Sequence, residues 1–343
     1  MRRVLLSIPV FVLTALVTAQ PTVSQTGTPA RGVTAQADPL KLPNKDGSVK
    51  FAVLGDTGTG GSDQVAVAKQ LMNFKSKFAF DFALLLGDNL YGSENPRDYN
   101  RKFELPYKPL LDAGVKFYAA LGNHDDPNQR MYKQFNMNGE RYYTFKPSLI
   151  AGVRFFALDS NYMDPKQLEW LEKELSASGS DWKIAFFHHP MYASGMHGSD
   201  EILKQQLEPM FVKHGVNVVF TGHEHFYERI KPQKGIQHFV EGSSAKLRKG
   251  DINPRTGLTA FGYDAGYTFM LVEIDGNQMF FQAITERGQA IDSGVVVKNA
   301  RNEVVGTTGQ SATKPQAAPA KPAPAPAKPA PAPAKPAAPA PAK

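Results

Sequence analysis

The sequence contains no cysteine in its 343 residues. The chain can therefore form no disulfide and cannot carry a lipid on a cysteine, and any metal site must be built without thiolates. It also has no long apolar run of the kind that spans a bilayer: the most apolar stretch, residues 4–17, is short and contains Pro9. After removal of this stretch, no transmembrane segment is expected.

The folded part of the chain lacks net charge. The formal net charge of +7 is accounted for by the two N-terminal arginines, Arg2 and Arg3, and by five lysines close to the C-terminus: Lys314, Lys321, Lys328, Lys335 and Lys343. A basic domain that binds nucleic acid is therefore not expected, because the high isoelectric point belongs to the ends of the chain.

Composition divides the chain into four parts. Residues 1–19 have the positive start, apolar centre and small-residue end of a signal peptide, which predicts a periplasmic or secreted protein. Residues 20–46 predict a flexible lead-in, and 301–343 a disordered tail of Pro, Ala and Lys with lysines seven residues apart. The tail is either a spacer or a contact with an anionic cell envelope, and the sequence leaves the oligomeric state open.

Residues 47–300 have the patterning of one folded domain. Apolar strands alternate with amphipathic helices as far as residue 220, and only strands follow. This order predicts an α/β fold, a two-sheet β-sandwich flanked by helices on its outer faces. The strands are expected at residues 49–54, 82–86, 115–121, 142–145, 153–158, 182–187, 216–220, 236–240, 267–274, 278–285 and 294–297.

Five of the predicted strands run directly into side chains that can bind a metal. The motifs are FAVLGDTG, FALLLGDNLY, FYAALGNHD, IAFFHHP and NVVFTGHEH. The donors that they place at strand ends are Asp56, Asp88, Tyr91, Asn123, His188, His223 and His225. Carboxylate, phenolate, amide and imidazole donors suit iron, zinc or manganese. Seven donors exceed the need of one ion, so they predict two ions that share a bridging carboxylate.

The ordered motifs GDTG, GDNLY, GNHD, FFHHP and GHEH resemble those of the metallophosphoesterase superfamily and, within it, of the purple acid phosphatases of the small tartrate-resistant type. Tyr91, three residues after Asp88, is the discriminating detail, since the wider superfamily usually lacks a tyrosine ligand there. The resemblance implies that Asp56, Tyr91 and His225 bind Fe(III) and that Asp88 bridges. A second divalent ion, Fe(II), Zn or Mn, is then held by the set Asp88, Asn123, His188 and His223.

The same resemblance implies two catalytic histidines that bind no metal. His124 and His197 match the family's residues that hold the phosphate and protonate the leaving group. One departure concerns the fourth motif, where the family usually has Val-x-x-His and this chain has Ala185 before His188. By spacing alone the ligand could be His188 or the adjacent His189, and His188 keeps the family's distance to His197.

Three functions follow as expectations. The first is hydrolysis of small phosphate monoesters by a hydroxide on the dinuclear centre, with broad specificity and an acidic pH optimum. The second is a phosphodiesterase or nucleotide pyrophosphate hydrolase with the same metals. The third is an envelope-associated protein that binds phosphate ligands. The cationic loop 242–266, with Lys246, Arg248, Lys249 and Arg255, either rims the site or is solvated surface. Candidates for an apolar wall are Met191, Tyr192, Phe226 and Tyr263.

Overall fold

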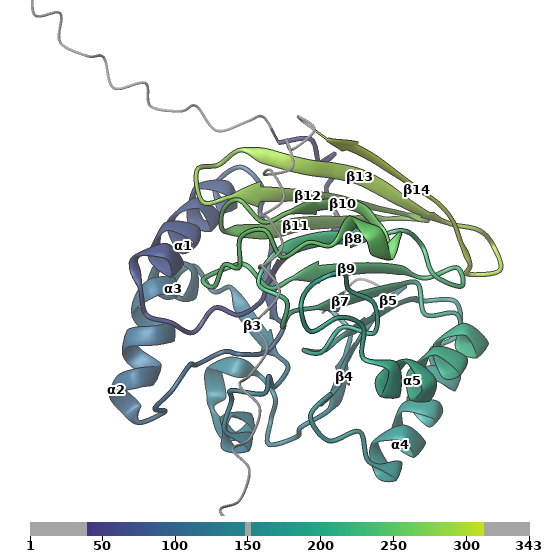
Figure 1. The fold of residues 1–343 in the computed structure, drawn as a ribbon, viewed down its shortest axis with the longest axis horizontal. Helices are drawn as coiled ribbons and strands as arrows, with labels where there is room; N and C mark the ends of the chain where they lie inside the picture. Colours follow the sequence, from purple (N-terminus) through teal and green to yellow (C-terminus); the bar gives the residue numbers. More distant parts are fainter. Residues whose placement is uncertain (1–39, 148–151, 312–343) are drawn as a thin grey trace, which may run out of the picture. The chain divides into compact units, whose positions relative to one another are not determined.

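The computed structural model describes residues 40–147 and 152–311. The expected signal peptide, most of the lead-in and nearly all of the Lys/Pro tail lie outside these residues. Within them, no helix has both the length and the apolar character needed to cross a bilayer. The described strands form two sheets of seven strands each, flanked by helices (Figure 1).

The first sheet combines three parallel strands with an antiparallel extension. Strand β1 (Val49–Leu54) pairs in parallel with β2 (Phe82–Leu85), and β2 pairs in parallel with β3 (Lys116–Ala119). On the other side of β1 follow the antiparallel strands β11 (Thr268–Asp275), β12 (Gln278–Thr285), β13 (Ala290–Lys298) and β14 (Val304–Ser311). The parallel half of this sheet brings the carboxyl ends of β1, β2 and β3 to one edge.

The second sheet has the order β10-β8-β9-β7-β6-β5-β4. Its strands are β4 (Tyr143–Phe145), β5 (Val153–Ala157), β6 (Trp182–Phe186), β7 (Val218–Thr221), β8 (Tyr227–Ile230), β9 (Gln237–Glu241) and β10 (Thr259–Tyr263). Strands β5, β6, β7 and β9 are parallel. The carboxyl ends of β6 and β7 are therefore adjacent, and these are the strands that precede the two histidine motifs.

Helices cover the outer face of each sheet. Helices α1 (Ser62–Lys75), α2 (Pro96–Tyr99) and α3 (Leu105–Asp112) lie beside the first sheet, with a π-helical turn at Asn100–Glu104, whereas α4 (Pro165–Ser176) and α5 (Glu201–His214) lie beside the second (Figure 1). Short 3-10 helices occupy Pro127–Met131, Lys133–Phe135 and Pro254–Thr256. This arrangement confirms the predicted two-sheet fold with helices on the outside.

The alternation of side chains along β1 shows how the layers are held together. Phe51 and Val53 point into the core between the sheets, while Ala52 and Leu54 pack under the helices. Phe51 contacts the ring of Phe155 in the opposite sheet edge-on, with centroids 5.2 Å apart. Burial on both faces explains why the last four residues of the strand, Phe51–Leu54, are all apolar, since a parallel strand between two layers has no solvated side.

The structure extends the folded body beyond both expected boundaries. The predicted tail beginning at residue 301 is wrong for its first residues, because β14 adds a paired strand to β13. At the other end the backbone N–H groups of Asn44 and Lys45 donate to the carboxylate of Glu273, so this part of the lead-in is fixed to β11. Strands β8, β10 and β14 were not expected from the sequence pattern.

Candidate metal centre

All seven predicted donors lie in loops that follow the carboxyl ends of parallel strands. Asp56 follows β1, Asp88 and Tyr91 follow β2, and Asn123 follows β3. From the second sheet, His188 follows β6, and His223 and His225 follow β7. The two sheets therefore each contribute ligand loops to one site, as the motif positions predicted.

The first group of donors is formed by Asp56, Tyr91 and His225. The Tyr91 hydroxyl donates to Asp56 Oδ1 at 2.9 Å, and His225 Nε2 lies 3.3 Å from the same oxygen and 3.4 Å from Tyr91 Oη. A carboxylate oxygen of Asp88 lies within 4.8 Å of the donor atoms of Asp56 and His225. These three oxygens and one nitrogen converge on a single point of the site.

The second group joins Asp88 to Asn123, His188 and His223. Asn123 Oδ1 lies 3.0 Å from both His188 Nε2 and His223 Nδ1, and these two nitrogens are 3.1 Å apart. Asp88 Oδ1 is 3.4 Å from His188 Nε2. Asp88 thus adjoins both groups, which is the position that a bridging carboxylate requires.

The two adjacent histidines His188 and His189 differ in burial and in their hydrogen-bond partners. His188 is fully buried, and its Nδ1–H donates to the carbonyl of Leu86 at 3.0 Å, so Nε2 faces the other donors. A hydrogen bond of this kind fixes the orientation and tautomer of a ligating imidazole. The ring nitrogen of His189 also lies within 4.8 Å of those of His188 and His223, but its Nδ1 is hydrogen bonded to Ser160 Oγ at 2.9 Å.

The distances between donors fit a pair of cations. Ligands about 2.1 Å from one ion lie roughly 3.0 to 3.4 Å from one another when they coordinate it together. The spacings in both groups, from 2.9 to 3.4 Å, lie close to this range. Asp56 and Asp88 are buried with almost no exposed surface, and such carboxylates need a compensating positive charge.

The pKa values of the donor side chains are also consistent with cation binding. Burial, together with the nearby charge of Asp88, raises the pKa of Asp56 to about 8. Burial also opposes ionisation of Asp88, but His188 and the backbone N–H of His124 outweigh it and hold that pKa below its usual value. Burial and neighbouring cationic groups lower the pKa of His225 to about 4, which leaves its imidazole neutral and able to bind a metal.

Three donor residues hold an uncommon backbone conformation. Asp56, Asp88 and His223 have φ angles of 56°, 50° and 70°, in the left-handed region that costs a non-glycine residue free energy. Gly122 makes the close approach of two ligand loops possible, since a Cβ there would lie 2.2 Å from the backbone nitrogen of Asp88. The glycines in the motifs are therefore steric requirements of the ligand geometry.

The two predicted catalytic histidines lie beside the donor groups. The ring of His124 is 4.9 Å from that of Tyr91, and its backbone N–H donates to Asp88 Oδ1 at 3.0 Å. The ring of His197 is 4.4 Å from that of His223, and its side chain is 38% exposed. Both rings therefore reach the site from positions where a substrate can contact them.

Glu224 is a site residue that the sequence reasoning missed. Its carboxylate is fully buried, and Oε1 accepts the backbone N–H groups of His197 and Gly198 at 2.8 and 2.9 Å. Oε2 lies 3.4 Å from His197 Nδ1 and 3.5 Å from Arg248 Nη1. A buried acid between two ligand histidines in the GHEH motif was the available signal.

Two of the cationic side chains of loop 242–266 face the site, and two are exposed to solvent. Lys246 Nζ lies 4.5 Å from the centre of the Tyr91 ring, and Arg248 contacts Glu224, so these two cations face the site. Lys249 and Arg255 are exposed. The expected apolar wall is wrong for Met191 and Phe226, because both side chains are fully buried in core clusters.

Comparisons with known proteins agree with this geometry. Residues 49–227 match the family model described as calcineurin-like phosphoesterase, a range that includes every predicted donor. Purple acid phosphatase 17 of Arabidopsis thaliana is 29% identical over 67% of this chain and 79% of its own length. Tartrate-resistant acid phosphatase type 5 of Homo sapiens is 24% identical over 76% of this chain and 96% of its own.

Solved structures show the same fold. A purple acid phosphatase from yellow lupin superimposes with a TM-score of 0.63 at 18% identity, covering 76% of this chain and 56% of that one. GAP50, the anchor in the inner membrane complex of Plasmodium, gives a TM-score of 0.63 at 19% identity over 79% of this chain and 90% of that one. With motifs, strand order and family match in agreement, the chain belongs to the calcineurin-like phosphoesterase family, and its relatives include purple and tartrate-resistant acid phosphatases.

Proposed function

We propose that the protein hydrolyses small phosphate monoesters at a centre of two cations, with an acidic pH optimum and broad specificity. The observation that supports this most strongly is the convergence of seven O and N donors in two groups joined by Asp88. Asp56, Tyr91 and His225 would hold Fe(III), and Asn123, His188 and His223 would hold Fe(II), Zn or Mn. When bound, such ions lower the pKa of water and neutralise phosphate oxygens.

The chain's own residues would position the ester and supply the proton. The exposed rings of His124 and His197 lie next to Tyr91 and His223, so they can donate to phosphate oxygens on either side of the centre. Water would add to phosphorus as the ester P–O bond breaks, and the departing alkoxide would take a proton from His197. The water would give up one proton to solvent, and His197 would take one back from solvent, so that the products are the alcohol and hydrogen phosphate. Glu224 accepts the backbone N–H of His197 and lies 3.4 Å from its Nδ1, which Arg248 also approaches, so Nε2 would be the nitrogen that donates to the leaving oxygen.

The acidic optimum is supported by the state of the ligands. The pKa values of His223 and His225 are lowered to about 2 and about 4 by burial and by neighbouring cationic groups. Both imidazoles therefore stay neutral in mildly acidic solution and do not lose their ions to protonation.

Rates on p-nitrophenyl phosphate and bis(p-nitrophenyl) phosphate, measured between pH 4 and pH 8, test this function. We expect the monoester to be hydrolysed at least about ten times faster than the diester, with a maximum below pH 7. A faster diester identifies a phosphodiesterase, and tight phosphate binding without turnover of either ester identifies a binding protein.

Metal analysis tests the assignment of the ligands. We expect two metal ions per chain in the wild type and in His189→Ala, and a loss of one ion in His188→Ala. Two retained ions in His188→Ala, with loss in His189→Ala, would reverse the assignment.

We also propose that the protein is exported and that its C-terminal tail serves as a spacer or contacts an anionic cell envelope. Both proposals rest on the composition of residues 1–19 and 301–343 alone. Removal of residues 312–343 should leave kcat/KM for p-nitrophenyl phosphate unchanged and, if the tail contacts an anionic envelope, should reduce sedimentation with anionic vesicles. Equal sedimentation of both proteins would leave the spacer role.

A further inference from the structure

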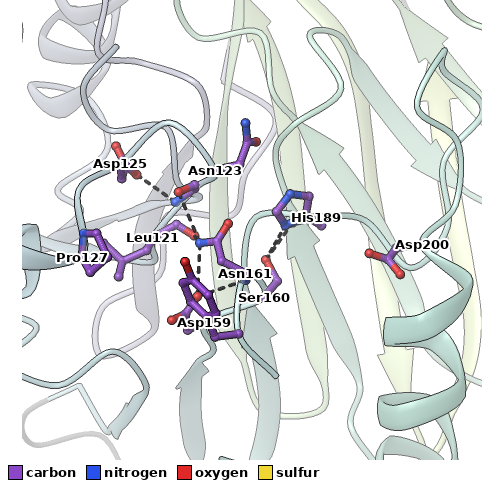
Figure 2. A pocket seen from close by; sticks show the side chains of 11 residues that line it. Leu121, Asn123, Asp125, Pro127, Asp159, Ser160, Asn161, His189 and Asp200 are labelled. Carbon is purple, nitrogen blue, oxygen red and sulfur yellow. Dashed lines mark hydrogen bonds between the residues drawn. The ribbon is translucent and has the colours of Figure 1, made fainter. Parts of the chain in front are cut away.

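A cavity of about 460 Å³ adjoins the metal centre on the side of Asn123 and His189. Ser160, Asn161, Asp159 and Asp200 also line it. Figure 2 shows these side chains, with the hydrogen bond between Ser160 and His189 dashed and Asp200 at the start of helix α5. Asn123 belongs both to the second donor group and to the cavity wall. A molecule that fills the cavity therefore lies next to the proposed metal ligands.

We propose that this cavity binds the alcohol portion of the phosphate ester, and that it selects alcohols carrying hydroxyl groups over those carrying a second anionic group. The inference rests on the proposed function and adds the substrate class to it. Apart from Asn123, the wall residues that it concerns are not among the proposed metal ligands.

The wall offers hydrogen bonds that suit hydroxyl groups. The Ser160 hydroxyl accepts the backbone N–H of His189 at 3.1 Å, and Oγ lies 2.9 Å from His189 Nδ1. In the tautomer that carries the ring proton on Nε2, the hydroxyl donates to Nδ1. The Asn161 amide donates inward, to the carbonyls of Leu121 and Gly122. Its carbonyl oxygen and the Nε2–H of His189 then provide an acceptor and a donor on the same wall.

The charges around the cavity disfavour a second anion. Among the described residues that line it, none is Lys or Arg. The Asp159 carboxylate is neutralised by Arg141, with Nη1 2.8 Å from Oδ2. Asp125 accepts N–H groups of the surrounding loops, including that of Gly122 at 2.8 Å, so it braces the wall.

Asp200 is the remaining carboxylate. Its Oδ1 caps helix α5 by accepting the N–H groups of Ile202 and Leu203, both at 3.0 Å. The positive end of the helix is thereby already satisfied and is not available to an anionic substrate. Oδ2 of the same carboxylate can accept a hydroxyl and repels a carboxylate or a second phosphate.

The position of the cavity also fits the departure of the alcohol. The rings of His189 and His197 lie 4.6 and 4.4 Å from that of His223. An alcohol protonated by His197 therefore leaves beside His223, within reach of the wall that carries His189. This places the proton donor and the alcohol site around one ligand.

Three esters of matched size test the proposal: glycerol 3-phosphate, 3-phosphoglycerate and n-propyl phosphate. All are three-carbon esters of primary alcohols, and they differ in bearing hydroxyls, a hydroxyl with a carboxylate, or neither. We expect kcat/KM of the wild type to be highest for glycerol 3-phosphate, by about ten-fold over 3-phosphoglycerate. Asp200→Asn keeps the helix cap and removes the charge, so it should reduce that ratio at least about three-fold and leave n-propyl phosphate within about two-fold.

Glu201→Gln is the matched control. It removes one carboxylate from the same helix end, but that side chain is 63% exposed and does not line the cavity. Its ratio should equal that of the wild type, and thermal unfolding of Asp200→Asn should show an intact fold. An unchanged ratio in Asp200→Asn, or a wild type that prefers 3-phosphoglycerate, overturns the inference alone. Failure to hydrolyse even p-nitrophenyl phosphate overturns the proposed function itself.

Discussion

The phenolic oxygen of Tyr91 lies 2.9 Å from Oδ1 of Asp56, although the two residues follow different strands and are 35 positions apart in sequence. In the metal-free protein the phenol is protonated, because burial and the charges of Asp56 and Asp88 raise the pKa of Tyr91 far above its usual value. Only a strongly charged cation at this point can remove that proton. The pair is therefore a sensitive reporter of the ion that is bound.

Replacement of Tyr91 by Phe should remove the colour of the iron-loaded protein. A phenolate bound to Fe(III) produces a visible charge-transfer band, so we expect a purple or pink wild type and a colourless variant. Loss of one ligand should also lower kcat/KM at least about ten-fold. Tyr267→Phe is the control, since that hydroxyl is hydrogen bonded to Asp63 on the surface. A band that survives in Tyr91→Phe would exclude Tyr91 as the source.

Replacement of Glu224 by Gln should separate proton donation from phosphate binding. Gln retains an oxygen for the backbone N–H groups of His197 and Gly198, but it removes the charge that faces His197 Nδ1. We expect kcat for n-propyl phosphate to fall about ten-fold or more, because its leaving group needs a proton.

p-Nitrophenyl phosphate is the internal control for this variant. Its phenolate leaves without a proton, so its kcat should change by less than about three-fold. Equal losses on both esters would assign Glu224 a purely structural role.

Because the ligand loops are closely packed, a single methyl group added at Gly122 should reduce both stability and metal content. Gly122→Ala places a Cβ 2.2 Å from the backbone nitrogen and Oδ1 of Asp88, which must then move. We expect a loss of about 1 to 3 kcal/mol in the free energy of unfolding and a reduced metal content. Gly306→Ala, where no atom lies within 4 Å of the added Cβ, should change neither quantity in urea titrations and metal analysis.

His238 predicts a pH dependence of stability that is independent of the metal ligands. Burial lowers the pKa of this side chain to about 3 in the folded protein, against about 6.5 in the unfolded chain. Between these values the unfolded chain binds more protons, so stability falls as the pH falls. From pH 7 to pH 5 the wild type should lose about 2 kcal/mol more than His238→Phe in urea unfolding. Parallel losses in the two proteins would contradict the assignment.

The proximity of the seven donor side chains could be predicted from the sequence because each of their motifs begins with an apolar run. Asp56 lies two residues beyond β1 and His188 two residues beyond β6, each at the edge of its own sheet where parallel strands end, so a linear pattern carries three-dimensional information. Strand β14 could not be recognised in the same way. Its residues, Val304–Ser311, are mostly polar and lie next to the Pro-rich tail. Its strand character depends on pairing with β13, which is a property of the fold.

The residues that surround the donors were harder to predict, because their contacts form only in the folded chain. Glu224 acts through a contact with His197, 27 residues away, and only the folded loops bring them together. Met191 and Phe226 have apolar side chains of the kind that line pockets, but both are buried in the core. Residue type identifies what can bind a metal, whereas the direction of a side chain in a loop depends on packing.

The left-handed backbone at Asp56, Asp88 and His223 has a consequence for the life of the protein before it acquires its ions. Each of these conformations costs of the order of 1 kcal/mol or more, and the mutual repulsion of the buried carboxylates adds to that cost. Cation binding offsets both, so a newly made chain that stays empty has looser ligand loops than a loaded one. Proteases should therefore cut empty copies first, and metal supply would set how many molecules persist.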